Sequence, residues 1–147
     1  MDFEETVSYL LAKVSISFRN TLQRHMEQIG LNSGQVFLLF ELWKADGQRQ
    51  VDLAARQGLS TPTINKMVKG LVDAGLVTRE RLEDDARSTR IFLTERGRGK
   101  ESVVEDQWRE LEEEIVSGLT EAERLMFSAI LVKMRRYFSG SDAEDDE

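Results

Sequence analysis

The stretch that decides the fold is QVDLAARQGLSTPTINKMVKGLVDAGLV, residues 50 to 77. It predicts two short helices joined at Gly58, because a glycine commonly ends a helix and Ser60 is a natural N-cap for the next one. Pro62 fits a first helical turn, where its missing N–H has no intrahelical partner. Gly75 supplies the C-terminal stop of the second helix. Two short helices around a tight turn are typical of a helix-turn-helix.

The second helix separates apolar from polar side chains. Its apolar residues follow spacings of three and four, which predicts one core-facing stripe of Ile64, Met67, Val68, Leu71 and Val72. The first helix is expected to pack through Val51, Leu53 and Ala54. The opposite face of the second helix is polar and basic, as a helix that enters the major groove of DNA requires.

The outward residues suit contacts with DNA. Asn65 can pair with an adenine edge, and Lys66 and Lys69 can reach guanine or phosphate. Thr61 or Thr63 can meet a thymine methyl or a phosphate, and N–H groups at the helix N-terminus favour an anion. The candidate recognition residues are Ser60, Thr61, Pro62, Thr63, Asn65, Lys66 and Lys69. The alternative is that they form only the solvated face of an amphipathic helix.

Two strand-like runs follow, residues 77–82 and 90–94, with a polar connection between them. They predict a hairpin with a long tip. A basic hairpin beside a reading helix is how winged helices touch the adjacent minor groove or the DNA backbone. Arg87 is the candidate for insertion, since a narrow minor groove attracts guanidinium, and Arg90 is a second candidate contact. Asp85 is expected to hold the Arg87 side chain or cap the turn.

Longer helices are predicted on both sides of this region. Residues 3 to 29 carry an apolar stripe that ends at Gly30. The next helix, capped by Asn32 or Ser33, has so little polar surface that it should be buried on most sides. After the hairpin, one face of a long helix is marked by Val103, Val104, Trp108, Leu111 and Ile115.

A last helix is predicted to open with a capping box formed by Thr120 and Glu123. The residues expected on its inner side are Leu125, Ile130, Leu131, Met134 and Phe138.

Composition excludes several classes of protein. A chain of 147 residues, 40% hydrophobic and 32% charged, is expected to fold as one compact domain with helical extensions. The chain has no Cys and a single His, His25, so zinc sites of clustered Cys or His are excluded. Metal sites built from carboxylates alone stay open, but no metal or cofactor is expected. We expect His25 to be a surface or packing residue. Without a nucleophile and base pair or a glycine-rich phosphate loop, the chain is not expected to be an enzyme.

The expected cellular location follows from the lack of a membrane-spanning segment and of a secretory signal. No apolar run approaches the ~20 residues that cross a bilayer, and the first residues are acidic where a secretory signal would be basic. We therefore expect a cytoplasmic protein with no membrane partner.

The charge of the chain is unevenly distributed. A net charge of −7 argues against nucleic acid, because DNA binding depends on neutralising phosphates. Residues 51–98, however, hold nine Lys and Arg against seven Asp and Glu, so this segment is +2 and the remainder is −9. Acidic residues crowd the C-terminus, and residues 139–147 are predicted to be a disordered acidic tail. The cations are thus concentrated in the predicted helix-turn-helix and hairpin.

The chain resembles the multiple antibiotic resistance regulator (MarR) family of bacterial and archaeal repressors over about residues 5 to 138. The order of elements carries the resemblance, together with LSTPTINKMVKGLVDAGLVTRE and DDARSTRIFLTERG. Its most specific part is the wing pattern D-x-R followed by apolar-x-L-T-x-x-G, met by Asp85, Arg87, Ile91, Leu93, Thr94 and Gly97. Ala86 and Lys66 stand where relatives commonly carry Arg, so an altered base preference is expected.

The resemblance implies an obligate homodimer whose terminal helices interlock through residues 3–25 and 100–138. The apolar stripes on those helices, too extensive for one small subunit to cover, favour the same conclusion.

The resemblance also implies an effector pocket between the dimerisation helices and the winged domain, commonly for small aromatic or phenolic anions. Candidate lining residues are Phe18, Phe37, Phe40 and Trp43, with Arg19 or Arg24 as counter-ion; the alternative is that the aromatic residues are ordinary core. Without Cys, control by thiol oxidation is excluded.

The predicted fold is mainly α with a small β-hairpin wing. A winged helix-turn-helix spans residues 31–98, and a helical dimerisation region spans residues 1–30 and 99–138. The predicted function is a homodimeric repressor that binds double-stranded DNA at a palindrome of about 15 to 20 base pairs and is released by a small molecule. The alternative is a winged-helix module that binds protein and not DNA, which the overall acidity would suit.

Overall fold

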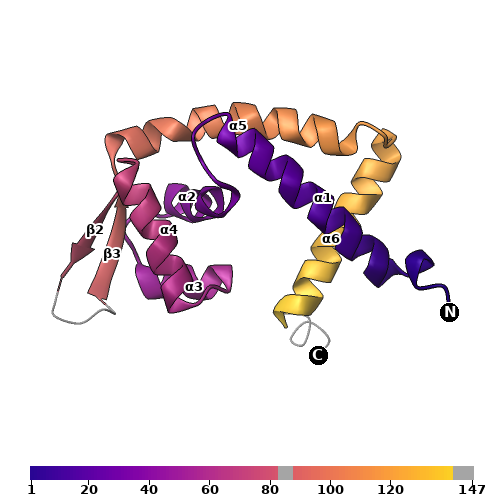
Figure 1. The fold of residues 1–147 in the computed structure, drawn as a ribbon, viewed down its shortest axis with the longest axis horizontal. Helices are drawn as coiled ribbons and strands as arrows, with labels where there is room; N and C mark the ends of the chain where they lie inside the picture. Colours follow the sequence, from indigo (N-terminus) through magenta and orange to yellow (C-terminus); the bar gives the residue numbers. More distant parts are fainter. Residues whose placement is uncertain (83–87, 141–147) are drawn as a thin grey trace. The chain divides into compact units, whose positions relative to one another are not determined.

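The computed structural model describes residues 1–82 and 88–140, and its elements follow the predicted order with one additional strand (Figure 1). The described residues hold six α-helices and a three-stranded antiparallel sheet, which confirms the predicted fold class. The chain forms two compact units, Met1–Leu111 and Glu112–Glu147. No helix of the described chain is both long and apolar enough to cross a membrane.

The first unit begins with a short 3-10 turn, η1 (Phe3–Glu5), and helix α1 (Val7–Glu27). The predicted helical start at residue 3 is wrong, because the Thr6 side chain accepts a hydrogen bond from Tyr9 N and caps the helix there. Helix α2 (Ser33–Lys44) has Asn32 as its N-cap, in a capping box completed by Gln35.

The helix-turn-helix is formed by α3 (Gln50–Gln57) and α4 (Thr61–Asp73). Gly58 ends α3 in the left-handed region, with φ of 63°, and Gly75 follows α4 with φ of 73°. Both predicted stops are confirmed, and the predicted cap at Ser60 is confirmed as well. The turn therefore depends on a backbone conformation that glycine adopts without strain.

The sheet contains β1 (Gln48–Arg49), β2 (Val77–Arg81) and β3 (Thr89–Leu93), in the order β1-β3-β2. The two predicted hairpin strands are present within a residue of their expected ends. Strand β1 was not predicted, because two residues carry no alternation and the strand exists only through its pairing with β3. This pairing attaches the hairpin to the start of α3.

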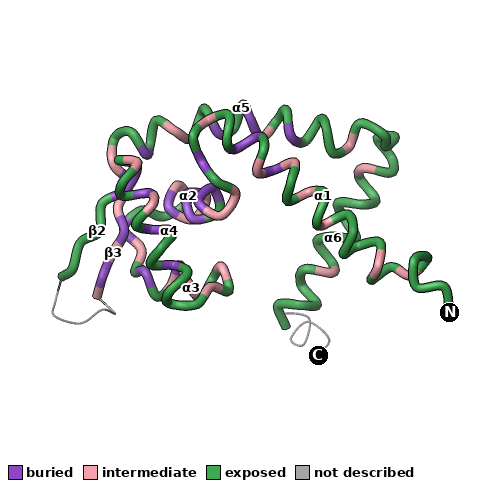
Figure 2. The backbone as a smooth tube through the Cα atoms, in the orientation of Figure 1, coloured by how far each residue is buried: buried purple, intermediate pink, exposed green. Residues whose placement is uncertain are grey.

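The hydrophobic core of the first unit joins the C-terminal half of α1, helices α2, α3 and α4, strands β2 and β3, and α5 (Glu95–Val116) (Figure 2). Its completely enclosed side chains include Leu22, Met26, Val36, Leu39, Leu42, Leu53, Val68, Leu71, Ile91 and Leu111. Three predicted core residues are exposed instead: Val51 at 41%, Val72 at 38% and Val103 at 41%. Val51 lies about 200° around the helix from buried Leu53, and the other two lie about 100° from a buried neighbour, so they fall at or beyond the edge of the apolar stripe.

In the second unit, helix α6 (Glu121–Ser139) opens with the predicted capping box of Thr120 and Glu123, which is confirmed. The prediction that its apolar residues lie inside is wrong for a single chain: Leu125, Ile130, Leu131 and Phe138 are 40–76% exposed, and Met134 is half-buried. Ile115 is likewise exposed. The described part of this unit consists of α6 and the end of α5, too little structure to cover these side chains. Of the predicted acidic tail, residues 141–147 lie outside the described residues.

Candidate nucleic-acid interface

The polar face of α4 is set by how the helix begins and what it buries. Ser60 Oγ accepts from Thr63 N at 3.4 Å, and the two hydroxyl oxygens lie 2.9 Å apart. Ile64, Val68 and Leu71 are no more than 2% exposed, which fixes the roll of the helix against the core. The remaining side of α4 consequently faces solvent.

The structure places every predicted recognition residue on this side of α4 or at its cap. The exposed residues are Ser60, Thr61, Pro62, Thr63, Asn65, Lys66 and Lys69. Lys69 Nζ lies 3.6 Å from Asp73 Oδ2, with side chains that are 76% and 66% exposed. Such an exposed ion pair contributes little, so exchanging the carboxylate for a phosphate costs little.

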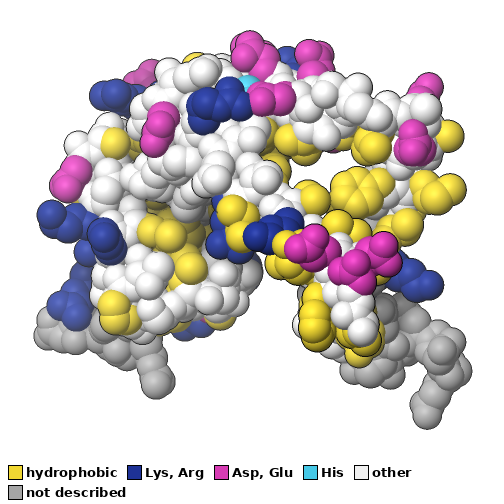
Figure 3. Space-filling model, turned by 45° about the vertical axis from the view of Figure 1, so that its right-hand side comes forward, with side chains coloured by type: hydrophobic (Ala, Val, Ile, Leu, Met, Phe, Trp, Pro, Cys, Tyr) yellow, Lys and Arg dark blue, Asp and Glu magenta, His cyan; other side chains and the backbone are white. Residues whose placement is uncertain are grey.

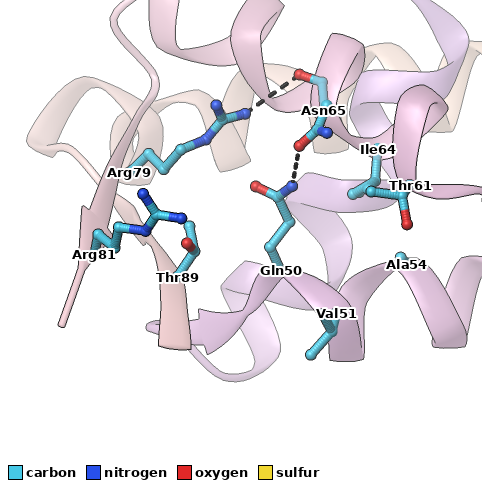
Figure 4. Close-up of a pocket in the computed structure, with 9 residues that line it drawn as sticks. All are labelled: Gln50, Val51, Ala54, Thr61, Ile64, Asn65, Arg79, Arg81 and Thr89. Carbon is cyan, nitrogen blue, oxygen red and sulfur yellow. Dashed lines mark hydrogen bonds between the residues drawn. The ribbon is translucent and has the colours of Figure 1, made fainter. Parts of the chain in front are cut away.

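Asn65 is held from two sides (Figure 4). Gln50 Nε2 donates a hydrogen bond to Asn65 Oδ1, and Arg79 Nη2 donates to the backbone oxygen of Asn65 at 3.3 Å. These contacts tie α3, α4 and β2 together at the exposed face. They border a hollow of about 430 Å³, lined by Gln50, Val51, Ala54, Thr61, Ile64, Asn65, Arg79, Arg81 and Thr89.

Two basic residues of β2 reach this hollow that were not among the predicted wing residues. Arg79 and Arg81 stand two positions apart, so they project from the same face of the strand, as Figure 4 shows. That spacing is visible in the sequence and could have identified them. Figure 3 shows Lys and Arg side chains gathered over the hairpin side of this unit.

Of the predicted wing residues, Asp85 and Arg87 lie outside the described residues. Arg90 lies on β3 and is half-buried, with Nη1 donating to the backbone oxygen of Gly47 at 2.8 Å. This bond anchors β3 to the turn before β1, so at least one N–H of the Arg90 guanidinium is used in a hydrogen bond within the protein.

The start of α3 carries a further charged pair. Arg49 Nε donates to Asp52 Oδ2 at 3.0 Å, and Arg49 Nη2 donates to Oδ1 at 3.2 Å. These hydrogen bonds lower the pKa of Asp52 and raise the pKa of Arg49. Both groups therefore stay ionised at neutral pH, and together they add no net charge beside α4.

The aromatic residues predicted to line an effector pocket are only partly brought together. The ring centroid of Phe40 lies 5.7 Å from that of Phe37, 6.0 Å from that of Trp43 and 5.0 Å from that of Trp108. Phe18 is half-buried against the core, and Arg19 is exposed. A hollow of about 420 Å³ is lined by Phe40, Trp43, Glu101, Val104, Glu105, Trp108 and Arg109.

Trp108 and Arg109 were not among the predicted pocket residues. The predicted counter-ions Arg19 and Arg24 do not line this hollow. Arg109 does, but it is paired with Asp106 at 2.9 Å and with Glu105 at 3.8 Å. The sequence already places Trp108 on the apolar face of α5. Its contact with Phe40 of α2 could not be predicted, because the two residues are far apart in sequence.

His25 belongs to a buried polar joint between α1 and α5. It is 5% exposed, and its Nδ1 lies 2.6 Å from Gln107 Nε2. Gln107 Nε2 also donates to Gln28 Oε1 and Glu110 Oε2, each at 3.3 Å. This arrangement places His25 as a packing residue, one of the two roles expected. Among the described residues, no cluster of three or more His, Asp or Glu side chains could hold a metal ion.

Apolar side chains are uncovered on two helices. On α1, Val7 is 74% exposed, Leu10 51% and Val14 58%. On α6, Met126 is 66% exposed, Phe127 45% and Phe138 76%, and Figure 3 shows such side chains open to solvent. On each helix, several exposed apolar side chains of this kind are typical of an interface with another protein.

The comparison with known proteins gives a consistent result. The sequence model of the MarR family matches residues 31–89. The HTH-type transcriptional repressor Rv2887 of Mycobacterium tuberculosis is 26% identical over 128 residues, which cover 87% of this chain and 92% of the repressor. The match thus extends well beyond the winged region.

Two solved structures show the same fold. A MarR transcriptional regulator from Methanosarcina mazei Go1 superposes with a TM-score of 0.81 and 26% identity, over 95% of this chain and 93% of that one. The MepR of S. aureus, solved in complex with DNA, superposes with a TM-score of 0.72 and 27% identity, over 93% and 99% of the two chains.

Proposed function

The chain belongs to the MarR family of transcriptional regulators, and from this premise we propose that it is a homodimeric repressor that binds a palindromic DNA operator. The family is one of regulators and not of enzymes. The observation that carries the proposal is the exposed polar face of α4, held in place by its buried stripe and by the contacts from Gln50 and Arg79. We propose a cytoplasmic location, because the ligand is chromosomal DNA.

The reading surface combines helix and wing. Lys66 and Lys69 reach phosphate or guanine, Thr61 and Thr63 meet phosphate or a thymine methyl, and the N-terminus of α4 at Ser60 faces a phosphate. On the hairpin, Arg79 and Arg81 extend the basic surface that the sequence assigns to Asp85, Arg87 and Arg90. The MepR complex with DNA is a precedent for this use of the fold.

Two copies of this surface are needed for specific affinity, because residues 51–98 carry a net charge of only +2. The uncovered apolar residues of α1 and α6 supply the surface through which two copies associate. A dimer spaces its two reading helices about one helical turn apart on DNA, which matches a palindrome. We assign residues 1–30 and 99–138 to this dimerisation region and residues 31–98 to the DNA-binding domain.

Release from DNA is assigned to a small aromatic or phenolic anion. The favoured site is the 420 Å³ hollow and the aromatic cluster beside it, formed by Phe37, Phe40, Trp43 and Trp108. Two other candidates, Phe18 and Arg19, lie on α1 and do not line this hollow. A ligand that binds only the folded dimer raises its melting temperature, so a thermal-shift screen of phenolic acids tests this part.

Selection of bound fragments from the source genome tests DNA binding itself. We expect enrichment of one palindromic sequence, and a gel shift that survives excess non-specific competitor DNA. Lys66→Ala and Arg87→Ala should each weaken binding, and their combination more so, whereas Lys44→Ala, which removes the same single charge as either of them but from α2, should not. Binding to no sequence in preference to another would reject the proposal in favour of a protein-interaction module.

A further inference from the structure

Gln50 contacts the exposed reading face although it is itself buried. Only 8% of Gln50 is exposed, and its Nε2 donates to Asn65 Oδ1 from the adjacent helix. Gln50 Oε1 is buried and has no hydrogen-bond partner among the described residues. An amide buried in this way, with one end joined to an exposed reading residue, fixes the orientation of that residue.

The surroundings of Gln50 decide which way round the two amides lie. Figure 4 shows Gln50 Oε1 on the side of Arg79 and Arg81, and Nε2 on the side of Asn65. The reverse arrangement would turn the two N–H donors of Gln50 towards these guanidinium groups with no acceptor. The observed arrangement leaves one carbonyl oxygen facing positive charge, which is favourable.

The consequence for exposed Asn65 is that its oxygen is turned towards buried Gln50, which leaves Nδ2 as the end of the amide available to DNA. We propose that Gln50 is a specificity-determining positioning residue, which makes Asn65 present hydrogen-bond donors to the major groove and so favours guanine. This inference rests on the proposed DNA-binding function. It refines the adenine contact that the sequence suggests, since a bidentate contact with adenine needs the oxygen and the nitrogen of the amide side by side at the base edge, and the bond to Gln50 holds the oxygen towards the buried amide.

The donor pattern of the bases supports guanine. Guanine presents two adjacent acceptors, N7 and O6, in the major groove, whereas cytosine presents the N4 amino donor and adenine one acceptor beside one donor. An outward NH₂ group can donate to both guanine atoms and meets a donor on cytosine.

The test uses the full chain and the operator found by fragment selection. Each half-site position is changed to all four bases, and binding is measured for the wild type, Gln50→Glu, Gln50→Met and Asn65→Ala. At the position where Asn65→Ala loses discrimination, we expect the wild type to favour guanine over adenine by about tenfold. Gln50→Glu accepts a hydrogen bond from Asn65 Nδ2, turns Oδ1 outward, and should move the preference to adenine or cytosine. Gln50→Met should lower discrimination to about twofold or less.

A residue that only stabilises the fold would weaken binding to all sequences equally. Each Gln50 variant is therefore repeated in the Asn65→Ala background, where we expect no further change in base preference. An unchanged guanine preference in Gln50→Glu, or an effect of Gln50 that persists without Asn65, overturns the inference while DNA binding itself stands. If Gln50→Met fails to fold, the nearly isosteric Gln50→Glu still decides the question. A wild type with no sequence preference overturns the proposed function and this inference together.

Discussion

At the residue scale, Gly97 shows how closely the wing is joined to the helix that follows it. A Cβ built on Gly97 would lie 2.0 Å from the backbone oxygen of Leu76. Thr94 links the same two segments: its Oγ1 donates to Gly75 O at 2.6 Å and accepts from Gly97 N at 3.0 Å. The glycine of the wing pattern is thus required by close packing of α5 against the end of the helix-turn-helix.

Gly97→Ala is expected to destabilise the protein by about 2 kcal/mol or more, because backbone atoms must move to admit the methyl group. Gly99→Ala is the matched control, since nothing lies within 4 Å of its built Cβ. In the same helix this second change should stabilise by about 0.5 to 1 kcal/mol through helix propensity. Chemical unfolding followed by circular dichroism compares the two, and equal effects would contradict the assigned packing.

At the element scale, local signals decided what could be predicted. The caps at Ser60 and Thr120 and the stops at Gly58 and Gly75 were readable, because each depends on residues adjacent in sequence. Strand β1 and the contact of Trp108 with Phe40 were not, because both depend on segments that are far apart in sequence.

The candidate site divides in the same way. The outward face of α4 followed from its periodicity, and all of its predicted residues are exposed. The hydrogen bonds that Gln50 and Arg79 donate to Asn65 could not be predicted, since each joins Asn65 to a different element of the fold. Burial of an amide beside an exposed asparagine has no signature in a single sequence.

The capping box of α6 predicts a dependence on pH. The hydrogen bond from Thr120 N to Glu123 lowers the pKa of Glu123 from its ordinary value of 4.5. The pKa of Glu123 is lower in the folded than in the unfolded protein. Its carboxylate therefore contributes fully to stability above the unfolded-state pKa, and this contribution is lost as the pH falls through the folded-state pKa. Glu123→Gln should therefore reduce the melting temperature at neutral pH but not under acidic conditions below that value.

Glu121→Gln is the control for this experiment, because Glu121 lies in the same first turn of α6 outside the capping box. It should leave the pH dependence as in the wild type, apart from a small change in the helix dipole interaction. A loss of stability in Glu123→Gln that is the same at all pH values would contradict the account of the cap.

At the scale of the whole molecule, the uncovered apolar surface of the terminal helices is the dominant feature. A single chain leaves Val7, Leu10, Met126, Phe127 and Phe138 between 45% and 76% exposed. Burying apolar surface releases roughly 25 cal/mol per Å², so a second copy is the natural cover for these side chains. Sequence periodicity identified these helix faces correctly as apolar, and their extent already favoured cover by a second subunit.

Phe127→Asp is expected to shift the protein from dimer towards monomer and to weaken operator binding by at least tenfold, because a charge at the interface lacks a partner. Leu82→Glu is the control for association alone, since Leu82 is 59% exposed but directly follows β2, outside the assigned interface. Sedimentation equilibrium measures the mass of each variant. A monomeric wild type, or a fully dimeric Phe127→Asp, would contradict the assigned interface.

The central claim is that the exposed face of α4 binds DNA by neutralising phosphates and reading bases. It is tested most directly by the salt dependence of operator binding for the wild type and Lys66→Ala, measured by fluorescence anisotropy. We predict that log K falls linearly with log salt, and that Lys66→Ala reduces the slope by about 2 for a dimer with one phosphate contact per subunit. An operator affinity that does not depend on salt, or a slope unchanged by the removal of Lys66, would contradict the account.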